Sequence, residues 1–158
     1  MKKERTAMYS EFIIQSNGTI KENIGFVANP NSTFDPDEIT KMLNIIPNNT
    51  MKLGEERKKG KGLYPFSTWS GCRKDTPRLE VEKQIMSSIN QLKDKISILK
   101  EIKKKYDVNF YMKSVPSIFN EGAPYVHYNQ KIIDFCYQTG TELGVHLYVF
   151  DTPKEESR

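Results

Sequence analysis

The chain has 158 residues, of which 28% are charged and 37% hydrophobic, and its net charge is +4. This length fits one domain over residues 1–158, with a core from about residue 8 to about residue 151 and flexible ends. No apolar run approaches a membrane span, and no signal-peptide core follows the charged start, so we expect a cytoplasmic protein that does not bind membranes.

The first part of the chain is predicted to form a β-hairpin. Residues 8–16 and 19–28 are partly apolar or β-branched, as strands usually are. The dipeptide Asn17-Gly18 joins them and favours the positive φ angles of a type I′ turn. The two runs are therefore predicted to pair with each other.

A short helix, a loop and a short strand are predicted next. Asp35 and Pro36 supply a helix cap and a first-turn proline, and the helix is expected to end before Pro47. Residues 48–63 have no sustained period and many charges and glycines, which predicts an exposed loop. Residues 64–70 are predicted to form a strand.

The longest predicted helix follows Pro77 and ends in Lys103-Lys104-Lys105. Its apolar stripe, in steps of three or four, consists of Val81, Ile85, Ile89, Leu92, Ile96, Leu99 and Ile102. We interpret this stripe as core. The three lysines complement the negative end of the helix dipole, an interpretation that we favour over nucleic-acid binding.

Two further strands and a helix are predicted towards the C-terminus. The apolar positions of the strands are Val108, Phe110 and Met112, and then Leu143, Val145, Leu147 and Val149. The helix between them carries Ile132, Ile133, Cys136 and Tyr137 and stops at Gly140. The order β-β-α-β-α-β-α-β predicts an α+β fold, a mixed sheet with three helices packed mainly on one face.

The most basic stretch of the sequence lies between Lys52 and Arg78, with eight Lys and Arg against three Asp and Glu, a net charge of +5. Its glycines do not form a nucleotide-binding P-loop, because five residues separate Gly54 from Gly60 and Gly62 replaces the required Ser or Thr. A cationic loop can still gather an anion, although a merely solvated loop explains the composition equally well.

The sequence contains no recognisable catalytic or metal-binding pattern. His127 and His146 have no metal-ligand spacing, and His146 is interpreted as structural. Cys72 and Cys136 lie far apart, without a neighbouring base or a Cys-x-x-Cys motif. We therefore expect a protein that is not an enzyme and that has no catalytic residues, metal ligands or cofactor.

A spaced pattern in the chain resembles the bacterial and phage family called domain of unknown function 4279. The resemblance covers roughly residues 24–151 and rests on Asp35-Pro36-Asp37-Glu38-Ile39-Thr40, Leu43, Pro47, Lys52-Leu53-Gly54-Glu55, Trp69, a long helix and a closing Leu147-Tyr148 strand. Asn44 stands where the family usually has glycine, and the N-terminal hairpin is extended. The resemblance implies a small α+β protein without an assigned reaction, and some members resemble immunity proteins of toxin systems.

Two functions follow from this sequence. The first is a binding protein that neutralises or regulates a macromolecule, namely a protein with an acidic surface. The alternative is a binder of a phosphate-bearing or nucleotide-like small molecule, enclosed by the basic loop and Trp69, a residue that is also typical of a core. Nucleic acid is a less expected partner. The candidate contact residues are Lys52, Glu55, Arg57, Lys58, Lys59, Lys61, Trp69 and Arg73.

Overall fold

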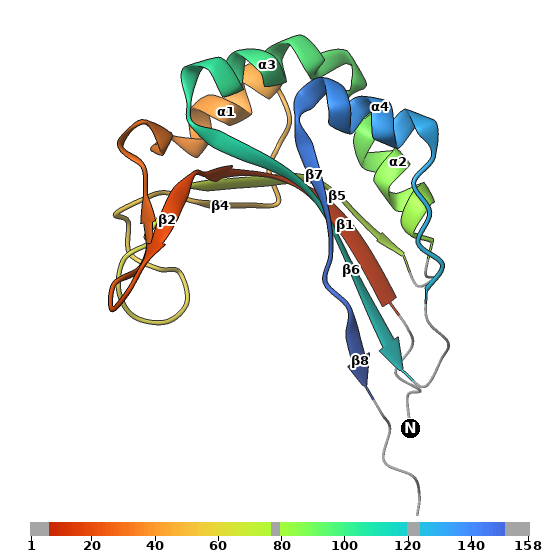
Figure 1. Cartoon of the computed structure of the whole chain (residues 1–158), viewed down its shortest axis with the longest axis horizontal. Coiled ribbons are helices and arrows are strands. Elements are labelled where there is room, and N and C mark those ends of the chain that lie inside the picture. Colours follow the sequence, from red (N-terminus) through yellow and green to blue (C-terminus); the bar gives the residue numbers. More distant parts are fainter. Residues whose placement is uncertain (1–6, 77–79, 120–123, 151–158) are drawn as a thin grey trace, which may run out of the picture.

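The computed structural model describes residues 7–76, 80–119 and 124–150, which form one sheet, a separate hairpin and a layer of helices (Figure 1). The strands are β1 (Ala7–Ser16), β2 (Gly18–Lys21), β3 (Gly25–Ala28), β4 (Asn49–Met51), β5 (Thr68–Thr76), β6 (Val108–Phe119), β7 (Thr141–Val145) and β8 (Tyr148–Phe150). The helices are α1 (Pro36–Leu43), α2 (Val81–Leu92), α3 (Ile96–Lys105) and α4 (Gln130–Thr139), with 3-10 helices η1 (Pro30–Ser32) and η2 (Lys93–Lys95).

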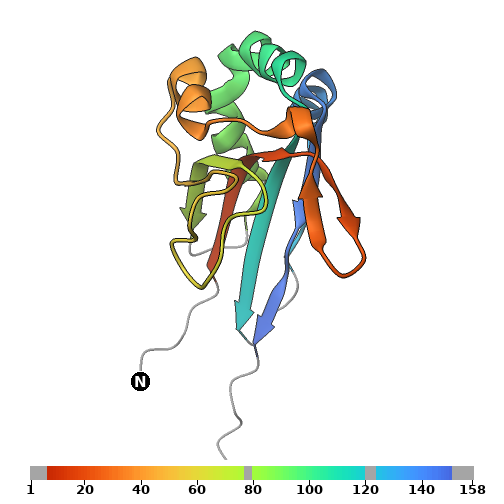
Figure 2. The same cartoon turned by 90° about the vertical axis from the view of Figure 1, so that its left-hand side faces the viewer.

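The main sheet has the strand order β4-β5-β1-β6-β7, and β8 also pairs with β6. β1 runs antiparallel to β5 and β6, whereas β7 and β8 run parallel to β6. All four α-helices lie on one side of this sheet (Figures 1 and 2). The predicted α+β class, with a mixed sheet and helices on one face, is confirmed, although the order of elements differs from the predicted one.

The hydrophobic core fills the space between the sheet and the helices. Side chains alternate between the two faces of a strand, and the even-numbered residues of β1 and β6 supply much of the core. Phe12 and Phe110 are fully buried, and their ring centroids lie 5.5 Å apart. The apolar stripe of α2 and α3 packs against them, as the sequence indicated.

The predicted hairpin between residues 8–16 and 19–28 is wrong. β1 pairs with β5 and β6, while β2 pairs with β3, so Asn17-Gly18 links the sheet to a separate hairpin. The hairpin turn lies at residues 22–24, where Asn23 has a φ of 66°. Asn17 is instead anchored to Asp107, through a bond from its backbone N–H to the Asp107 carbonyl and from its amide to the Asp107 carboxylate.

The long helix predicted after Pro77 is broken into α2 and α3 by η2. α2 packs mainly on β5 and β1, whereas α3 packs on β6 and against α1 and α4. The break lets each segment follow a different part of the twisted sheet, which one straight helix could not do. The predicted start at Pro77 lies outside the described residues, as do both ends of the chain.

The caps predicted for the shorter helices are confirmed. The Asp35 carboxylate accepts a hydrogen bond from the Asp37 N–H at 3.0 Å and begins α1. Asn44, which replaces the glycine usual in the resembled family, ends α1 in the left-handed conformation with a φ of 53°. Gly140 ends α4 in the same way. Asn tolerates this conformation better than most residues, which preserves the helix end.

The last strand was predicted as one run and is divided into β7 and β8. The His146 N–H donates to the Ser114 carbonyl at 2.8 Å. The next bond of a parallel ladder would come from the N–H of residue 116, but Pro116 has none.

The predicted strand at residues 64–70 is also displaced, because β5 begins at Thr68. In the described part of the chain, no helix is long and apolar enough to cross a membrane.

Candidate functional site

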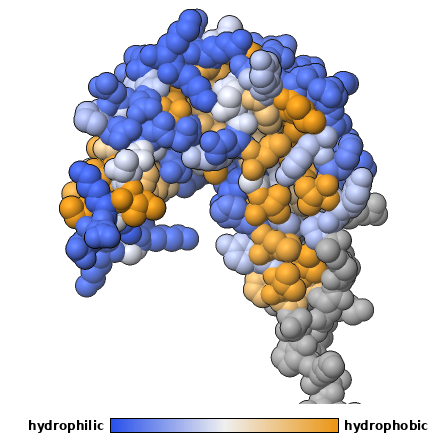
Figure 3. Space-filling view, viewed as in Figure 1, coloured by the Kyte–Doolittle hydropathy of each residue, from blue (hydrophilic) through white to orange (hydrophobic). Residues whose placement is uncertain are grey.

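The sheet face opposite the helices is concave, and no described helix covers it (Figure 3). Odd-numbered residues of β1 and β6 point to this face, because their even-numbered neighbours are buried beneath the helices. Opposed pairs on it include Glu11 with Lys113 and Ile13 with Tyr111. We call this surface the concave face. It carries half-buried aromatic, charged and aliphatic side chains side by side.

A shallow hollow of about 260 Å³ lies on the concave face across β1, β6 and β7. Its lining residues are Ile13, Gln15, Tyr111, Lys113, Gly144 and His146. The alternation of the last strand placed His146 on the opposite face from its apolar neighbours, and the structure does so. Tyr111 and Lys113 were not recognised as candidates. Their alternation with Phe110 and Met112 in the sequence was the available signal.

The basic loop is an ordered turn-back of the chain, which we call the basic hairpin (residues 54–64). The Gly54 N–H donates to the Tyr64 carbonyl and the Tyr64 N–H to the Glu55 carbonyl, each at 2.9 Å. The Arg57 N–H bonds the carbonyl of Gly62, whose φ is 95°. The glycine supplies a left-handed turn that other residues rarely adopt. The expected loop therefore has an internal backbone framework.

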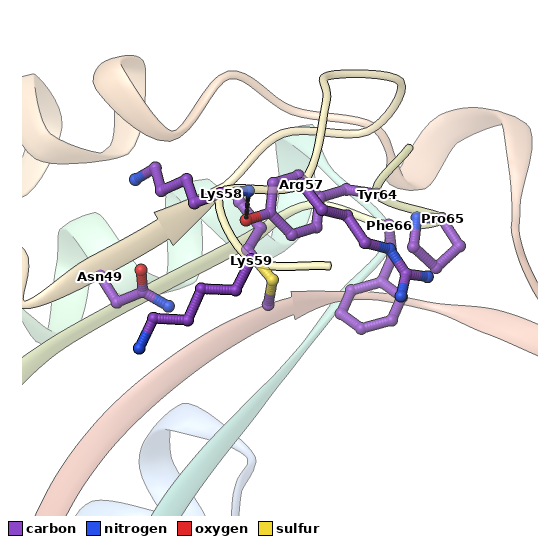
Figure 4. A pocket seen from close by; sticks show the side chains of 8 residues that line it. Asn49, Arg57, Lys58, Lys59, Tyr64, Pro65 and Phe66 are labelled. Carbon is purple, nitrogen blue, oxygen red and sulfur yellow. Dashed lines mark hydrogen bonds between the residues drawn. The ribbon is translucent and has the colours of Figure 1, made fainter. Parts of the chain in front are cut away.

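A second hollow, of about 540 Å³, lies beneath the basic hairpin (Figure 4). Its lining residues are Asn49, Met51, Arg57, Lys58, Lys59, Tyr64, Pro65 and Phe66. Aromatic and aliphatic side chains thus stand beside three cations. This volume falls within the usual range for small-molecule sites, and the hollow is also open enough to receive a protein surface.

Both hollows belong to one continuous surface. Asn49, in the second hollow, is the cross-strand partner of Ser70, which in turn faces Ile13 in the first. Opposed residues on adjacent strands share a face of the sheet. A parallel row joins Met51 to Gln15 through Thr68. The concave face therefore runs from the edge strand β7 to the basic hairpin.

The four predicted cations of the basic hairpin form no ion pair within the part of the chain that the structure describes. Arg57 uses its Nε to bond the Leu63 carbonyl at 3.2 Å, and Lys58 approaches the Thr50 carbonyl at 3.4 Å. All four side chains belong to exposed residues. Arg57, Lys58, Lys59 and Lys61 therefore carry charges that no carboxylate among the described residues neutralises through an ion pair.

Three other predicted contact residues have structural partners. Lys52 bonds Asp35 at 2.8 Å, and this hydrogen bond lowers the pKa of the aspartate and raises that of the lysine. Arg73 bonds Asp75 at 2.9 Å and lies 3.7 Å from the ring centre of Tyr9. Glu55 contributes its backbone to the base of the hairpin. Lys52 therefore braces the start of α1, and Arg73 belongs to the β1–β5 part of the sheet.

Trp69 is a correction to the predicted contact set. Its side chain is fully buried, and its indole N–H donates to the Thr40 hydroxyl at 3.0 Å. Because Trp69 points towards α1, it lies on the helix side of β5, opposite the concave face. It cannot enclose a ligand held by the basic hairpin. Phe66 and Tyr64 supply the aromatic surface there instead.

Cys72 is buried, Cys136 is partly buried, and His127 contacts a carboxylate. Burial raises the pKa of Cys72 to about 12 and that of Cys136 to about 11, which keeps both thiols protonated. His127 contacts Glu82 at 2.7 Å, and this bond, with a second from Asn129, lowers the pKa of the glutamate. In the described part of the chain, no cluster of three potential metal ligands occurs.

Comparison with protein families gave a match over residues 21–150 to the family described as Domain of unknown function (DUF4279). Comparison with curated proteins and with solved structures gave no match. The matched range begins at the last residue of β2 and ends with β8. It includes the basic hairpin and most of the concave face, whereas β1 precedes it.

Proposed function

The chain belongs to the DUF4279 family, a domain of unknown function, and from this premise we propose that it is a non-enzymatic binding protein that neutralises or regulates a macromolecule. The proposed partner is a cytoplasmic protein with an acidic surface, in a bacterial or phage-infected cell. An immunity protein or an anti-defence inhibitor works in this way, by covering its target. The basic hairpin and the adjoining concave face would form the contact surface.

One observation carries this proposal: the basic hairpin presents four cations that have no carboxylate partner among the described residues, beside an uncovered sheet face. Exposed cations that form no ion pair within the chain can meet the carboxylates of a partner at little cost to folding. The ordered backbone of the hairpin reduces the entropy lost when a partner binds. Aromatic side chains at its base offer the apolar contacts that protein interfaces need.

The test is a charge reversal, Lys58→Glu with Lys59→Glu, in the full chain. A partner captured from the natural host is identified and then titrated against each variant at low and high ionic strength. We expect the double variant to bind at least about tenfold more weakly, mostly through slower association, and to lose most of the salt dependence.

The matched control is Lys93→Glu with Lys100→Glu, which makes the same charge change at exposed positions of the helical layer. This control is expected to bind as the unaltered chain does. If both double variants bound the partner equally weakly, the net charge of the chain would explain the loss of affinity. Unchanged binding by the hairpin variant would remove the hairpin from the interface.

A second candidate is a small phosphate-bearing or nucleotide-like ligand in the hollow beneath the basic hairpin. Its volume of about 540 Å³ and its mixture of cations with Tyr64 and Phe66 favour this candidate. Trp69 fluorescence is a poor probe, because the indole lies on the other side of β5. Calorimetric titration with a nucleotide panel is the direct test, and absence of heat across the panel would exclude nucleotides.

A further inference from the structure

The sheet has one long open edge, formed by residues 141–150, which we call the edge strand. It contains β7 and β8 and runs along β6 (Figure 1). Among the described strands, none pairs with its outer side. At the opposite edge, β4 has only three residues and is followed by the basic hairpin. An uncovered strand of this length is a template for pairing with another chain.

The backbone groups of the edge strand that point away from β6 can be deduced from those that bond β6. The His146 N–H points inward, because it bonds the Ser114 carbonyl of β6. In a strand paired in parallel, the N–H and C=O of alternate residues point to opposite sides. Leu143 and Val145 therefore present their N–H and C=O groups outwards, where no described strand meets them.

The same side of the molecule exposes an apolar band. Val145, Leu147 and Val149 are 39%, 49% and 63% exposed. Hydrophobic surface gathers around the position of β8 in Figure 3. On α4, Ile133 and Tyr137 are 47% and 89% exposed. Of the thirteen exposed large hydrophobic residues in the described part of the chain, seven belong to α4 and the edge strand.

One exposed apolar residue of α4, Ile133, lies on the edge side of that helix. Lys131, Asp134 and Gln138 share a groove with α2, which defines the inner flank of α4. By helical periodicity Ile133 lies on the side away from α2, whereas Tyr137 lies opposite the buried side chains of α4 and points away from the sheet. Because α4 packs on β7, its outer flank continues the outer side of the edge strand.

We propose that a second copy of this chain docks on the edge strand, antiparallel, about a two-fold axis at Gly144. This register places Leu143 opposite Val145 of the other copy, so that their outward backbone groups bond each other. Glu142 then lies opposite His146 of the other copy. These are the only acidic and the only imidazole side chains of the edge strand, and the axis brings them together twice.

Gly144 supports this axis independently. Its backbone does not require glycine, because its φ is not positive, and a Cβ there would meet nothing within 4 Å. Within one copy, a larger residue would fit. At the axis, however, the two central residues form a non-hydrogen-bonded pair, in which the chains approach most closely. Two glycines meet there without side-chain conflict, and Ile133 of both copies lies towards the contact.

The test is the mass of the untagged full chain in solution, measured by light scattering and sedimentation over a range of concentrations. We expect a dimer. Val145→Pro removes an outward N–H without removing a bond to β6, so it should give a monomer with an unchanged circular dichroism spectrum. Ile46→Lys alters an apolar residue that is 88% exposed elsewhere, and should leave the dimer intact.

Charge exchange tests the register. Glu142→Lys removes the acidic partner of each His146, and His146→Glu places a second carboxylate opposite each Glu142. Each substitution should weaken dimerisation by about tenfold, and the double variant, which again pairs opposite charges, should restore it. A monomer at every concentration would overturn the proposal. A dimer that survives Val145→Pro, or that the double variant does not restore, would also overturn it. Partner capture through the basic hairpin is measured separately, so the two proposals fail independently.

Discussion

The indole N–H of Trp69 donates to the hydroxyl of Thr40, a 3.0 Å bond that fastens α1 to the start of β5. The other face of β5 presents a contrasting case one residue away. Thr68 is 3% exposed, and its hydroxyl has no hydrogen-bond partner among the described residues. Two threonines therefore lie on either side of one strand with opposite hydrogen-bonding states.

These two threonines should respond oppositely to valine. Thr68→Val removes an unsatisfied buried hydroxyl and should stabilise the fold by about 1 kcal/mol. Thr40→Val leaves the Trp69 N–H without its acceptor and should destabilise it by about 1–2 kcal/mol. Urea unfolding followed by Trp69 emission measures both. Equal effects of the two substitutions would contradict the assigned hydrogen bonds.

Gln84 should be the most sensitive polar residue of α2. Its amide donates to the Met8 carbonyl at 2.9 Å, and its side-chain oxygen accepts from the Ser10 hydroxyl at 3.1 Å. Gln84→Leu removes both of these buried bonds and should cost about 2–3 kcal/mol. Gln91→Leu, at an exposed position of the same helix, is the control and should stay within about 0.5 kcal/mol. Denaturant midpoints compare the two.

Asp107 should make the β2–β3 hairpin sensitive to acid. Its carboxylate accepts bonds from the amides of Asn17 and Asn29, both at 2.8 Å, and these bonds lower its pKa below the ordinary value of 3.8. The stabilisation is complete above the ordinary pKa and is lost as the pH falls through the lower folded value. Asp107→Asn should therefore be less stable than the unaltered chain at pH 7, and the difference should vanish in acid.

Amide hydrogen exchange of residues 18–28 locates this effect, because the hairpin should exchange faster in Asp107→Asn than in the unaltered chain. Asp94→Asn, in the exposed η2 segment, is the control. A stability difference between Asp107→Asn and the unaltered chain that persists undiminished at low pH would show that its cause is not the carboxylate charge.

Asn44 gives a test of backbone strain at the end of α1. Asn44→Ala should cost about 1 kcal/mol, because alanine tolerates a φ of 53° poorly. Asn44→Gly should be within about 0.5 kcal/mol of the unaltered chain, since glycine reaches this conformation without steric conflict. Thermal unfolding ranks the three side chains. Equal stabilities of Asn44→Ala and Asn44→Gly would mean that the backbone at the end of α1 relaxes to another conformation.

Local rules predicted the elements whose causes are local. Asp35 caps α1 and Gly140 ends α4 through neighbouring residues alone, so the sequence was enough. The turn predicted at Asn17-Gly18 was wrong because Asn17 bonds Asp107, ninety positions along the chain. Turn propensities describe neighbouring residues only and cannot predict such a contact. The division of the last strand likewise depends on Pro116, which lies in another strand.

The candidate site shows the same division between local and distant causes. Charge counting found Arg57, Lys58, Lys59 and Lys61, which the structure keeps together. It could not find Lys113 and Tyr111, because they join the surface only through the pairing of β6 with β1. Trp69 was misplaced among the contact residues because the face of a strand that meets the helices is decided by the whole sheet.

The single helical layer has an evolutionary consequence. Since the core lies on one side of the sheet, substitutions at Ile13, Tyr111 or Lys113 change the concave face while leaving Phe12, Phe110 and Met112 in place beneath the helices. The side chains that stabilise the core and those that form the concave face therefore alternate along the same strands. Substitutions on the concave face are therefore expected to leave the free energy of unfolding nearly unchanged, so this surface can diversify without loss of the fold.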